Sequence, residues 1–413
     1  MRCKYCLALL LSLSPPIHAA GWDFGAKIPV APIAESNVFQ HLDATGRKSM
    51  AVSGNTLAVV WEDNRDGSPQ AHVALKIMDK DVFSEARRIS AGKSAFGPTI
   101  LALRPDRFLV GWEQDNAVWT RLVAPQGLGP SLKLSGKDAT QIALATHDGQ
   151  RVVAVWCQRA GKFNRVVAHE LKIGIEGGIV NAGKPKPVDA KPPVDDQSSP
   201  TVVVTKKGTL VAWEDRRRKH TVLSYSHATP GGSFSAPQLL NEVVKKSDRY
   251  GRGSGVTRVA LDVYGEDRIA ATWMDKRGDQ TGYDIYAAFS EDGGRRFGVN
   301  ELVQDSFADQ YAQWHPAIAG DAAGRVIVAW DDDRDDVSSI WLAWKTRYGW
   351  SMNFSPPVAS GDGEKTSPSI TLDARGNLHL IWLGQEAENG PGRVMYSMGS
   401  NSGAAPRQAQ PSK

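Results

Sequence analysis

Residues 326–330 read Val-Ile-Val-Ala-Trp, an uninterrupted apolar run that ends in tryptophan. Six further segments show the same pattern, and successive tryptophans lie 44 to 60 residues apart. These segments are residues 57–61, 108–112, 152–156, 210–213, 269–273 and 378–382. Apolar residues at both alternating positions are typical of a strand that is covered on both faces. The repetition therefore predicts several copies of one β-structural unit.

Other features recur in phase with these runs. A proline opens an upstream apolar stretch in four of the units, and a third apolar stretch, such as residues 284–289, follows the tryptophan. A fourth stretch then opens with phenylalanine and a small residue. The prolines are Pro98, Pro200, Pro316 and Pro368, and the phenylalanines are Phe83, Phe234, Phe297 and Phe354. Four short antiparallel strands in roughly 50 residues predict a blade of a β-propeller.

The two ends of the chain complement each other. Residues 24–30 match the fourth-strand pattern without three strands before them, whereas the last unit ends after its third strand, residues 393–398. We therefore predict an all-β, seven-bladed β-propeller of four-stranded antiparallel blades, in which the N-terminal strand completes the last blade. Closure of the ring removes unpaired sheet edges. The expected domain spans residues 21–399, and residues 400–413 are expected to be a disordered tail.

The first twenty residues resemble a secretory signal peptide. Arg2 and Lys4 precede a short apolar stretch, residues 5–13, and small residues follow it. We therefore expect a secreted or periplasmic protein. Only Cys157 of the three cysteines would remain after cleavage, so no intramolecular disulfide is expected. Its position at the end of an apolar run favours a buried structural thiol over a reactive one.

The overall composition excludes several classes of protein. Apolar residues make up 41% and charged residues 23%, with a formal net charge of +4, which indicates a globular chain without the basic excess of a nucleic-acid binder. No apolar run after residue 20 is long enough to span a bilayer. The histidines lack metal-ligand spacing, and residues 331–336 lack the pattern of a calcium loop, so no metal or cofactor is expected.

Residues 290–297 read Ser-Glu-Asp-Gly-Gly-Arg-Arg-Phe and fit the Asp-box pattern Ser-x-Asp-x-Gly-x-x-aromatic. On this motif the chain resembles the sialidase superfamily and its exported relatives with bacterial neuraminidase repeats. The resemblance implies a structural turn, formed by Ser290, Asp292, Gly294 and Phe297, on the face away from the active site. It also leaves a six-bladed, sialidase-like propeller as an alternative fold. The family's Arg-Ile-Pro is replaced by Lys-Ile-Pro at residues 27–29, and no catalytic residue can be transferred.

Four units carry the motif Trp-x-Asp-x-Arg directly after the tryptophan. The acid–base pairs are Asp63 and Arg65, Asp215 and Arg217, Asp275 and Arg277, and Asp332 and Arg334. The favoured interpretation is structural: each aspartate caps its turn, and each arginine bridges to a neighbouring blade. The alternative is a rim of guanidinium groups that binds carboxylates, phosphates or acidic sugars.

Two connections between units are longer than their counterparts and are candidates for ligand binding. Residues 241–258 contain Arg249 and Tyr250, and residues 304–316 contain Tyr311, Trp314 and His315. Aromatic and cationic side chains together can stack on sugar rings and hold acidic groups. For the second connection, packing of Tyr311 and Trp314 between blades is an equally good interpretation.

The leading functional hypothesis is an exported, non-catalytic, monomeric propeller whose loops bind a glycan or a protein partner. A divergent exo-glycosidase of sialidase type that acts on an acidic sugar is the second hypothesis. The third is a scaffold or assembly factor of an envelope complex. Neither nucleic-acid binding nor membrane insertion is expected.

Overall fold

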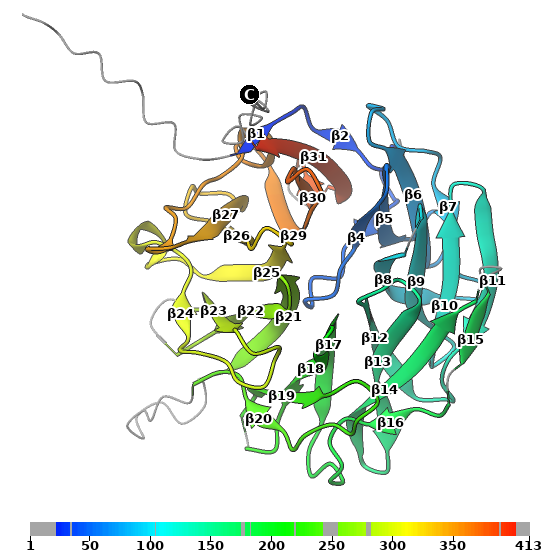
Figure 1. The fold of residues 1–413 in the computed structure, drawn as a ribbon. Helices are drawn as coiled ribbons and strands as arrows, with labels where there is room; N and C mark the ends of the chain where they lie inside the picture. The colour runs from blue at the N-terminus through cyan, green and yellow to red at the C-terminus, as the bar shows by residue number, and fades with distance from the viewer. Residues whose placement is uncertain are drawn as a thin grey trace, which may run out of the picture.

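The computed structural model describes residues 22–401, apart from residues 34, 104, 175–177, 182, 219, 243–254, 278–281 and 388–389. The described residues form seven antiparallel sheets around a central axis, as blades of a β-propeller (Figure 1). The predicted seven-bladed fold is confirmed, and the six-bladed alternative is wrong because each tryptophan-ended strand belongs to a separate sheet. No helix among these residues has the length and apolar character needed to cross a bilayer.

Each blade places its strands in sequence order from the axis outwards (Figure 1). The innermost strands are β3 (Gln40–His41) with β4 (Met50–Ser53), β8 (Ala95–Leu103), β12 (Ala139–Thr146), β17 (Gln197–Thr205), β21 (Val256–Tyr264), β25 (Gln313–Gly320) and β29 (Glu364–Leu372). The second strands, which carry the tryptophans, are β5 (Thr56–Asp63), β9 (Arg107–Gln114), β13 (Arg151–Ala160), β18 (Gly208–Asp215), β22 (Arg268–Asp275), β26 (Val326–Asp332) and β30 (Leu378–Gln385).

The third strands are β6 (Gln70–Ile77), β10 (Ala117–Ala124), β14 (Phe163–Ile173), β19 (Val222–Ala228), β23 (Asp284–Ser290), β27 (Ser339–Thr346) and β31 (Arg393–Asn401). The outermost strands are β7 (Arg87–Arg88), β11 (Gly127–Lys133), β15 (Ile179–Asn181) with β16 (Lys186–Pro187), β20 (Gln238–Leu239), β24 (Glu301–Leu302) and β28 (Gly349–Trp350), and β1 (Trp22–Phe24) with β2 (Ile28–Pro29) in blade 7. Two short 3-10 helices, η2 (Ser306–Ala308) and η3 (Pro357–Ala359), lie in the connections.

The N-terminal strands close the ring as predicted. Strands β1 and β2 both pair with β31, and Trp22 lies opposite Asn401 (Figure 1). The indole of Trp22 also packs edge-on against Trp344 of blade 6, with ring centroids 5.6 Å apart. Because of this pairing, β31 continues two residues beyond the expected end of the domain at residue 399.

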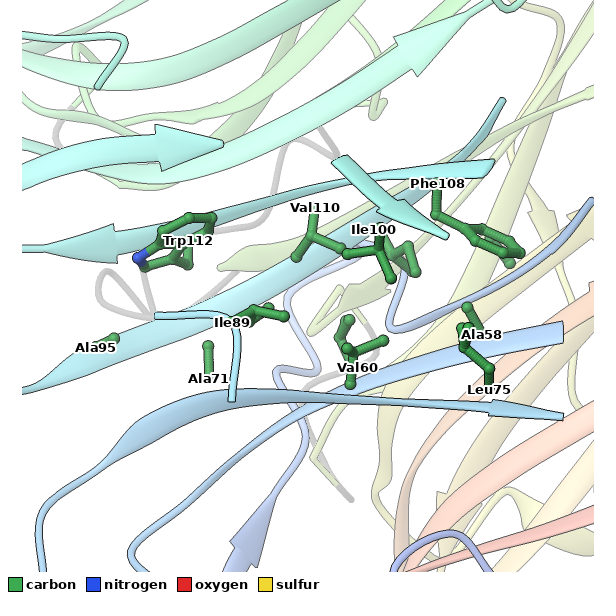
Figure 2. Packing of buried hydrophobic residues seen from close by; sticks show 13 residues of the cluster. Ala58, Val60, Ala71, Leu75, Ile89, Ala95, Ile100, Phe108, Val110 and Trp112 are labelled. Carbon is green, nitrogen blue, oxygen red and sulfur yellow. The ribbon is translucent and has the colours of Figure 1, made fainter. Parts of the chain in front are cut away.

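The core consists of the interfaces between neighbouring blades. All seven repeat tryptophans are at most 1% exposed. Figure 2 shows the interface of blades 1 and 2, where Val60 and Leu75 face Ile100 and Phe108. Such burial stabilises by about 25 cal/mol for each Å² of apolar surface removed from water. The thiol of Cys157 lies in the interface of blades 3 and 4, 2% exposed, so the prediction of a buried cysteine is confirmed, and its burial raises the pKa of the thiol.

The topology defines two faces of the ring. The turns between second and third strands and the connections between blades lie on one face, which we call the upper face. The turns between first and second strands and those between third and fourth strands lie on the lower face. The outer strands are shorter than predicted: the segment that opens with Phe234 contacts β19 first through the amide of Ser235, and regular pairing begins only at Gln238.

Candidate functional site

The four Trp-x-Asp-x-Arg motifs form closed turns on the upper face. In blade 1 the indole N–H of Trp61 donates to Asp63 (Nε1 to Oδ2, 2.7 Å), and the Arg65 backbone N–H and Nε donate to the same carboxylate. The corresponding indole bonds in blades 4, 5 and 6 are 3.1, 3.1 and 3.0 Å long, from Trp213 to Asp215, Trp273 to Asp275 and Trp330 to Asp332. Each carboxylate therefore has its donors inside its own turn.

Three of the motif arginines also contact the outer strands or the connections between blades. The Nη2 atoms of Arg217 and Arg277 donate to Asp189 and Asn300, at 2.7 Å each. In blade 6, Nη1 of Arg334 lies 3.3 Å from Asp305. The guanidinium groups of Arg277 and Arg334 also stack on Tyr286 and Trp341, respectively, each 4.0 Å from the ring centroid. Arg217 and Arg334 thus reach the connections that lead into their blades, whereas Asn300 and Tyr286 belong to the same blade as Arg277. Both the bridging of blades by each arginine and ligand binding by these arginines stay predictions.

The Asp-box residues form the turn between β23 and β24 on the lower face. Asp292 Oδ1 accepts the amides of Arg295 and Arg296 and the hydroxyl of Ser290. Gly294 has a positive φ of 94° and donates its amide to the Ser290 hydroxyl. The Phe297 ring packs edge-on against Tyr225 of blade 4, at 5.1 Å.

Of the two loops predicted to bind a ligand, the structure describes the candidate residues of only one. Arg249 and Tyr250 lie in residues 243–254, outside the described residues. In the other loop, Tyr311 and Trp314 are 38% and 39% exposed on the upper face. Trp314 is supported from one side by Tyr283, with ring centroids 5.4 Å apart and nearly perpendicular planes. These aromatic rings are therefore open to solvent while one of them is held in place by a neighbouring blade.

His315 directly follows Trp314, and the centroids of the two rings are 6.5 Å apart. Its Nδ1 lies 2.8 Å from Oδ1 of Asp331, the buried residue after the blade 6 tryptophan. Asp331 also accepts the backbone N–H of Ser367 from blade 7 at 2.9 Å. Burial raises the pKa of Asp331, although the His315 contact opposes this shift. A carboxylate buried behind one ring nitrogen fixes the orientation of the imidazole.

His315 belongs to a ring of equivalent positions. Each inner strand from β8 to β29 has a shift of register near its upper end, and a residue with positive φ lies at the shift. These residues are Gly97, Gln141, Ser199, Arg258, His315 and Ser367. At four of them the backbone N–H donates to a carboxylate that directly follows the tryptophan of the preceding blade. The acceptors are Glu62, Glu113, Glu214 and Asp331.

Blade 1 departs from this ring because an insertion interrupts its inner strand. Residues 42–49 separate β3 from β4 and enter the channel (Figure 1). Within the insertion Arg47 pairs with Asp43, and Arg258 Nη1 donates to the Ala44 carbonyl at 2.7 Å. Gly46, with φ +81°, lies so close to β21 that an added Cβ would be 2.0 Å from the Val259 carbonyl oxygen. The insertion separates the upper mouth from a lower channel cavity of about 240 Å³.

Polar side chains of the insertion, of its flanking strands and of the ring interact with one another at the upper end of the channel, and we call this group of residues the axial bowl. It comprises His41, Asp43, Arg47, Glu62, Glu113, Arg258 and His315. Its acidic side lies in blades 1 and 2, where burial raises the pKa of Glu62 and of Glu113. Asp43 differs, because Arg47 and Thr45 hold its pKa below the usual range despite its burial.

The basic side of the axial bowl lies towards blades 5 and 6. Desolvation lowers the pKa of His41; Asp43 opposes this shift, whereas His315 and Arg258 act in the same direction. His315 and Arg258 thus both disfavour the protonated form of His41. Among the described residues, no group of three or more His, Cys, Asp or Glu is placed to hold a metal ion. The bowl thus presents hydrogen-bond acceptors on one side and cationic donors on the other.

Of the axial bowl, sequence reasoning found only His315. A signal for the acidic side was present, because Glu62, Glu113, Glu214 and Asp331 each directly follow a repeat tryptophan. The insertion gave no such signal, since residues 42–49 contain neither a repeat element nor a conspicuous motif. Its path into the channel depends on the ring around it.

Comparison with protein-family models finds no match, and comparison with curated sequences finds none either. Solved structures do match. An ulvan lyase bound to -[GlcA(1-4)Rha3S]- superposes with a TM-score of 0.60 at 8% identity, over 89% of this chain and 95% of the lyase. The polysaccharide lyase Uly1 gives 0.54 at 8% identity, over 86% and 90%.

The α-L-arabinanase of Penicillium chrysogenum, complexed with arabinobiose, gives a TM-score of 0.51 at 11% identity, over 91% of this chain and 98% of the arabinanase. Identities this low show the shared fold alone. The chain is thus a β-propeller whose architecture is similar to that of glycan-active enzymes, and the narrower resemblance to sialidases rests on the sequence motif.

Proposed function

We propose that this protein binds an acidic glycan in the axial bowl on the upper face. The observation that carries the proposal is the electrostatic coupling of His41 to both Arg258 and His315, together with the exposed ring of Trp314 beside His315. Guanidinium and imidazolium groups bind carboxylates and sulfates through charge-assisted hydrogen bonds. An indole face stacks on the apolar face of a sugar ring.

The acidic side of the bowl has a complementary role in this proposal. Carboxylates accept hydrogen bonds from sugar hydroxyl groups, and Glu62 and Glu113 each already accept one backbone N–H, which fixes their orientation. An acidic sugar therefore meets acceptors for its hydroxyls on one side and donors for its charge on the other. The glycan-active neighbours of similar fold support the choice of a glycan over a protein partner.

The test is calorimetric binding of a uronate-containing oligosaccharide and of a neutral oligosaccharide of the same length. We expect the acidic ligand to bind at least about tenfold more tightly, which corresponds to 1.4 kcal/mol. Trp314→Ala should weaken binding by a similar factor. The matched control is Tyr348→Ala, which removes an aromatic ring that is 84% exposed at a lower-face turn. Equal affinity for both ligands, or an undiminished affinity of Trp314→Ala, would contradict the proposal.

The pH dependence gives an independent check. Because the pKa of His41 lies below its ordinary value, its imidazole gains a proton only as the pH falls below about 6.5. Affinity for the acidic ligand should therefore rise as the pH is lowered from 7 towards 5.5. His41→Gln should reduce this gain while the affinity at pH 7 changes little.

A second candidate function is cleavage of the bound glycan, and the contact of His315 with Asp331 is the observation that favours it. An imidazole whose Nδ1 is held by a buried carboxylate can exchange a proton at Nε2, which is the arrangement of a general base. In this case His315→Ala should abolish release of product from an acidic polysaccharide even at substrate concentrations that saturate its weakened binding site. No product from wild-type protein across a panel of acidic polysaccharides would exclude cleavage and leave the binding proposal intact.

A further inference from the structure

A second cavity lies between blades 3 and 4 on the lower face, opposite the axial bowl. It has a volume of about 430 Å³. Strands β13 and β14 form one wall, and the other consists of the turn between β17 and β18 together with residues 228–234. This size is within the range of pockets that hold small organic ligands.

The cavity lies where blade 3 lacks an aromatic ring that blades 4 to 7 have, and where it also lacks the leucines, Leu75 and Leu122, that blades 1 and 2 have instead. In blades 4 to 7 the third strand carries an aromatic residue that pairs with a residue of the second strand. That partner lies either one or three positions before the repeat tryptophan. These residues are Tyr225, Phe289, Trp344 and Tyr396. In blade 3 the two corresponding positions, opposite Val155 and Val153, are Ala168 and Glu170. Both residues line the cavity.

The missing ring leaves Phe234 without its expected partner. Two equivalent phenylalanines at the start of other outer strands pack edge-on against the ring of the preceding blade, Phe297 on Tyr225 at 5.1 Å and Phe83 on Tyr396 at 5.4 Å, whereas Phe354 stacks on Phe24 of the following blade. Phe234 occupies the same place in blade 4, yet no aromatic side chain among the described residues packs against its ring. One face of this half-buried ring therefore forms part of the cavity wall.

The rim of the cavity is positively charged. Lys184 and Lys186 approach from blade 3 and Lys206 from blade 4, and none of the three ammonium groups forms an ion pair with a described residue. The acidic residues of the cavity are already engaged. Glu170 forms a bidentate pair with Arg151 at 3.0 Å, and Asp148 accepts the backbone N–H groups of residues 150 and 151.

We propose that this cavity binds a small organic anion that consists of a six-membered ring with a carboxylate or sulfate group. The ring would lie against Phe234 in the space left by Ala168, and the three lysines would hold the charged group. Uronic or sulfated sugars and aromatic acids share this chemistry. The proposal does not depend on the axial bowl, because the two sites lie on opposite faces and share no residue.

The test is saturation-transfer NMR and titration of the full chain with glucuronate, glucose 6-sulfate, benzoate, methyl glucoside and inorganic sulfate. We expect at least one of the three ring anions to bind, with an affinity that falls as salt is raised. Which anion binds most tightly distinguishes a sugar acid from an aromatic acid. Methyl glucoside and inorganic sulfate should bind at least about tenfold more weakly, since methyl glucoside lacks the charged group and inorganic sulfate lacks the ring.

Two variants test whether the anion binds in this cavity. Ala168→Tyr restores the aromatic pair found in blades 4 and 7 and should abolish binding while the melting temperature is kept or raised. The triple substitution of Lys184, Lys186 and Lys206 by glutamine changes only exposed side chains, so folding should persist, and affinity should fall at least about tenfold. Absence of binding by all three ring anions, or unchanged binding in the triple variant, would overturn the proposal, as would equal binding of inorganic sulfate, which would indicate an adventitious ion only.

Discussion

The Trp-x-Asp-x-Arg turns and the axial bowl lie on the same face and use the same kinds of side chain, yet they differ in how these are engaged. In the turns, an aspartate such as Asp332 accepts from its own tryptophan and its own arginine. In the bowl, the donors and acceptors come from blades far apart in the sequence, such as His41, Glu113 and His315. The groups of the turns satisfy one another, whereas the bowl combines recurring carboxylates such as Glu113 with side chains that depart from the repeat, such as His41.

The same contrast applies to the interfaces between blades. The interface of blades 4 and 5 is filled by Tyr225 and Phe297, while that of blades 3 and 4 contains Ala168 opposite Phe234 and stays partly open. Departures from the repeat thus mark both candidate binding sites. The unfolding free energies of variants can show how strongly the repeated elements stabilise the ring and how much stability depends on residues that depart from the repeat.

The largest effect is expected when the closing strands are removed. Deletion of residues 22–31 would expose the edge of β31 and remove the buried side chains of Trp22 and Val30. We expect a loss of about 5 kcal/mol or more of unfolding free energy, measured by chemical denaturation. Truncation after Asn401 is the control and should leave the unfolding curve unchanged. A deletion variant as stable as the wild type would refute closure by these strands.

Within a repeated turn, removal of the central carboxylate should also be costly. Asp332→Ala leaves the buried guanidinium group of Arg334 and the indole N–H of Trp330 without their acceptor. We expect a loss of about 2–4 kcal/mol, since the Trp330 indole and two nitrogens of the guanidinium lose their acceptor while Nη1 keeps its ion pair with Asp305. The control is Asp333→Ala at the neighbouring exposed position, which should change stability by less than about 0.5 kcal/mol. Similar losses in both variants would show that burial of the turn is not the cause.

The close packing of residues 42–49 against blade 5 can be tested with a pair of glycines that have the same backbone conformation. Gly46 and Gly67 have φ values of +81° and +83°, but only Gly46 lies against another blade. Gly67→Ala should cost about 1 kcal/mol, the strain of a left-handed alanine. Gly46→Ala should cost about 1–3 kcal/mol more because its methyl group would meet the Val259 carbonyl. Equal melting temperatures of the two variants would argue against a tightly seated insertion.

A smaller effect, of opposite sign, is expected beside the blade 5 turn. Burial, together with the carboxylates of Asp275 and Asp309, raises the pKa of Asp284 to about 6. The folded protein therefore holds this proton more tightly than the unfolded chain, and the ionised carboxylate lowers stability above about pH 6. Asp284→Asn should stabilise the protein at pH 7 by about 1–2 kcal/mol, after allowance for solvent screening.

The gain from Asp284→Asn should shrink as the pH falls from 6 towards 4, where the carboxyl group becomes protonated in both states. Denaturation curves of both proteins at pH 7 and pH 4 measure the difference. A gain that is independent of pH would mean that the charge of Asp284 is not its origin.

The repeated elements were predictable because each is local. The apolar run before Trp330 and the fourth-strand pattern at residues 24–30 are read from neighbouring residues, and both predict strands that the structure contains. The axial bowl was largely missed, because Arg258 and His41 belong to no shared motif. The cavity at Ala168 was missed because an alanine in a strand is unremarkable until the register shows which position it occupies.

By itself, the sequence determined the number of blades, the position of the tryptophans and the strand that closes the ring. These follow from periodic burial, which each unit of about 50 residues repeats. Only the tertiary structure decided which charges are neutralised in turns and which face a cavity. The physical reason is that groups hundreds of residues apart, such as the Ala44 carbonyl and the Arg258 guanidinium group, meet only when the ring closes.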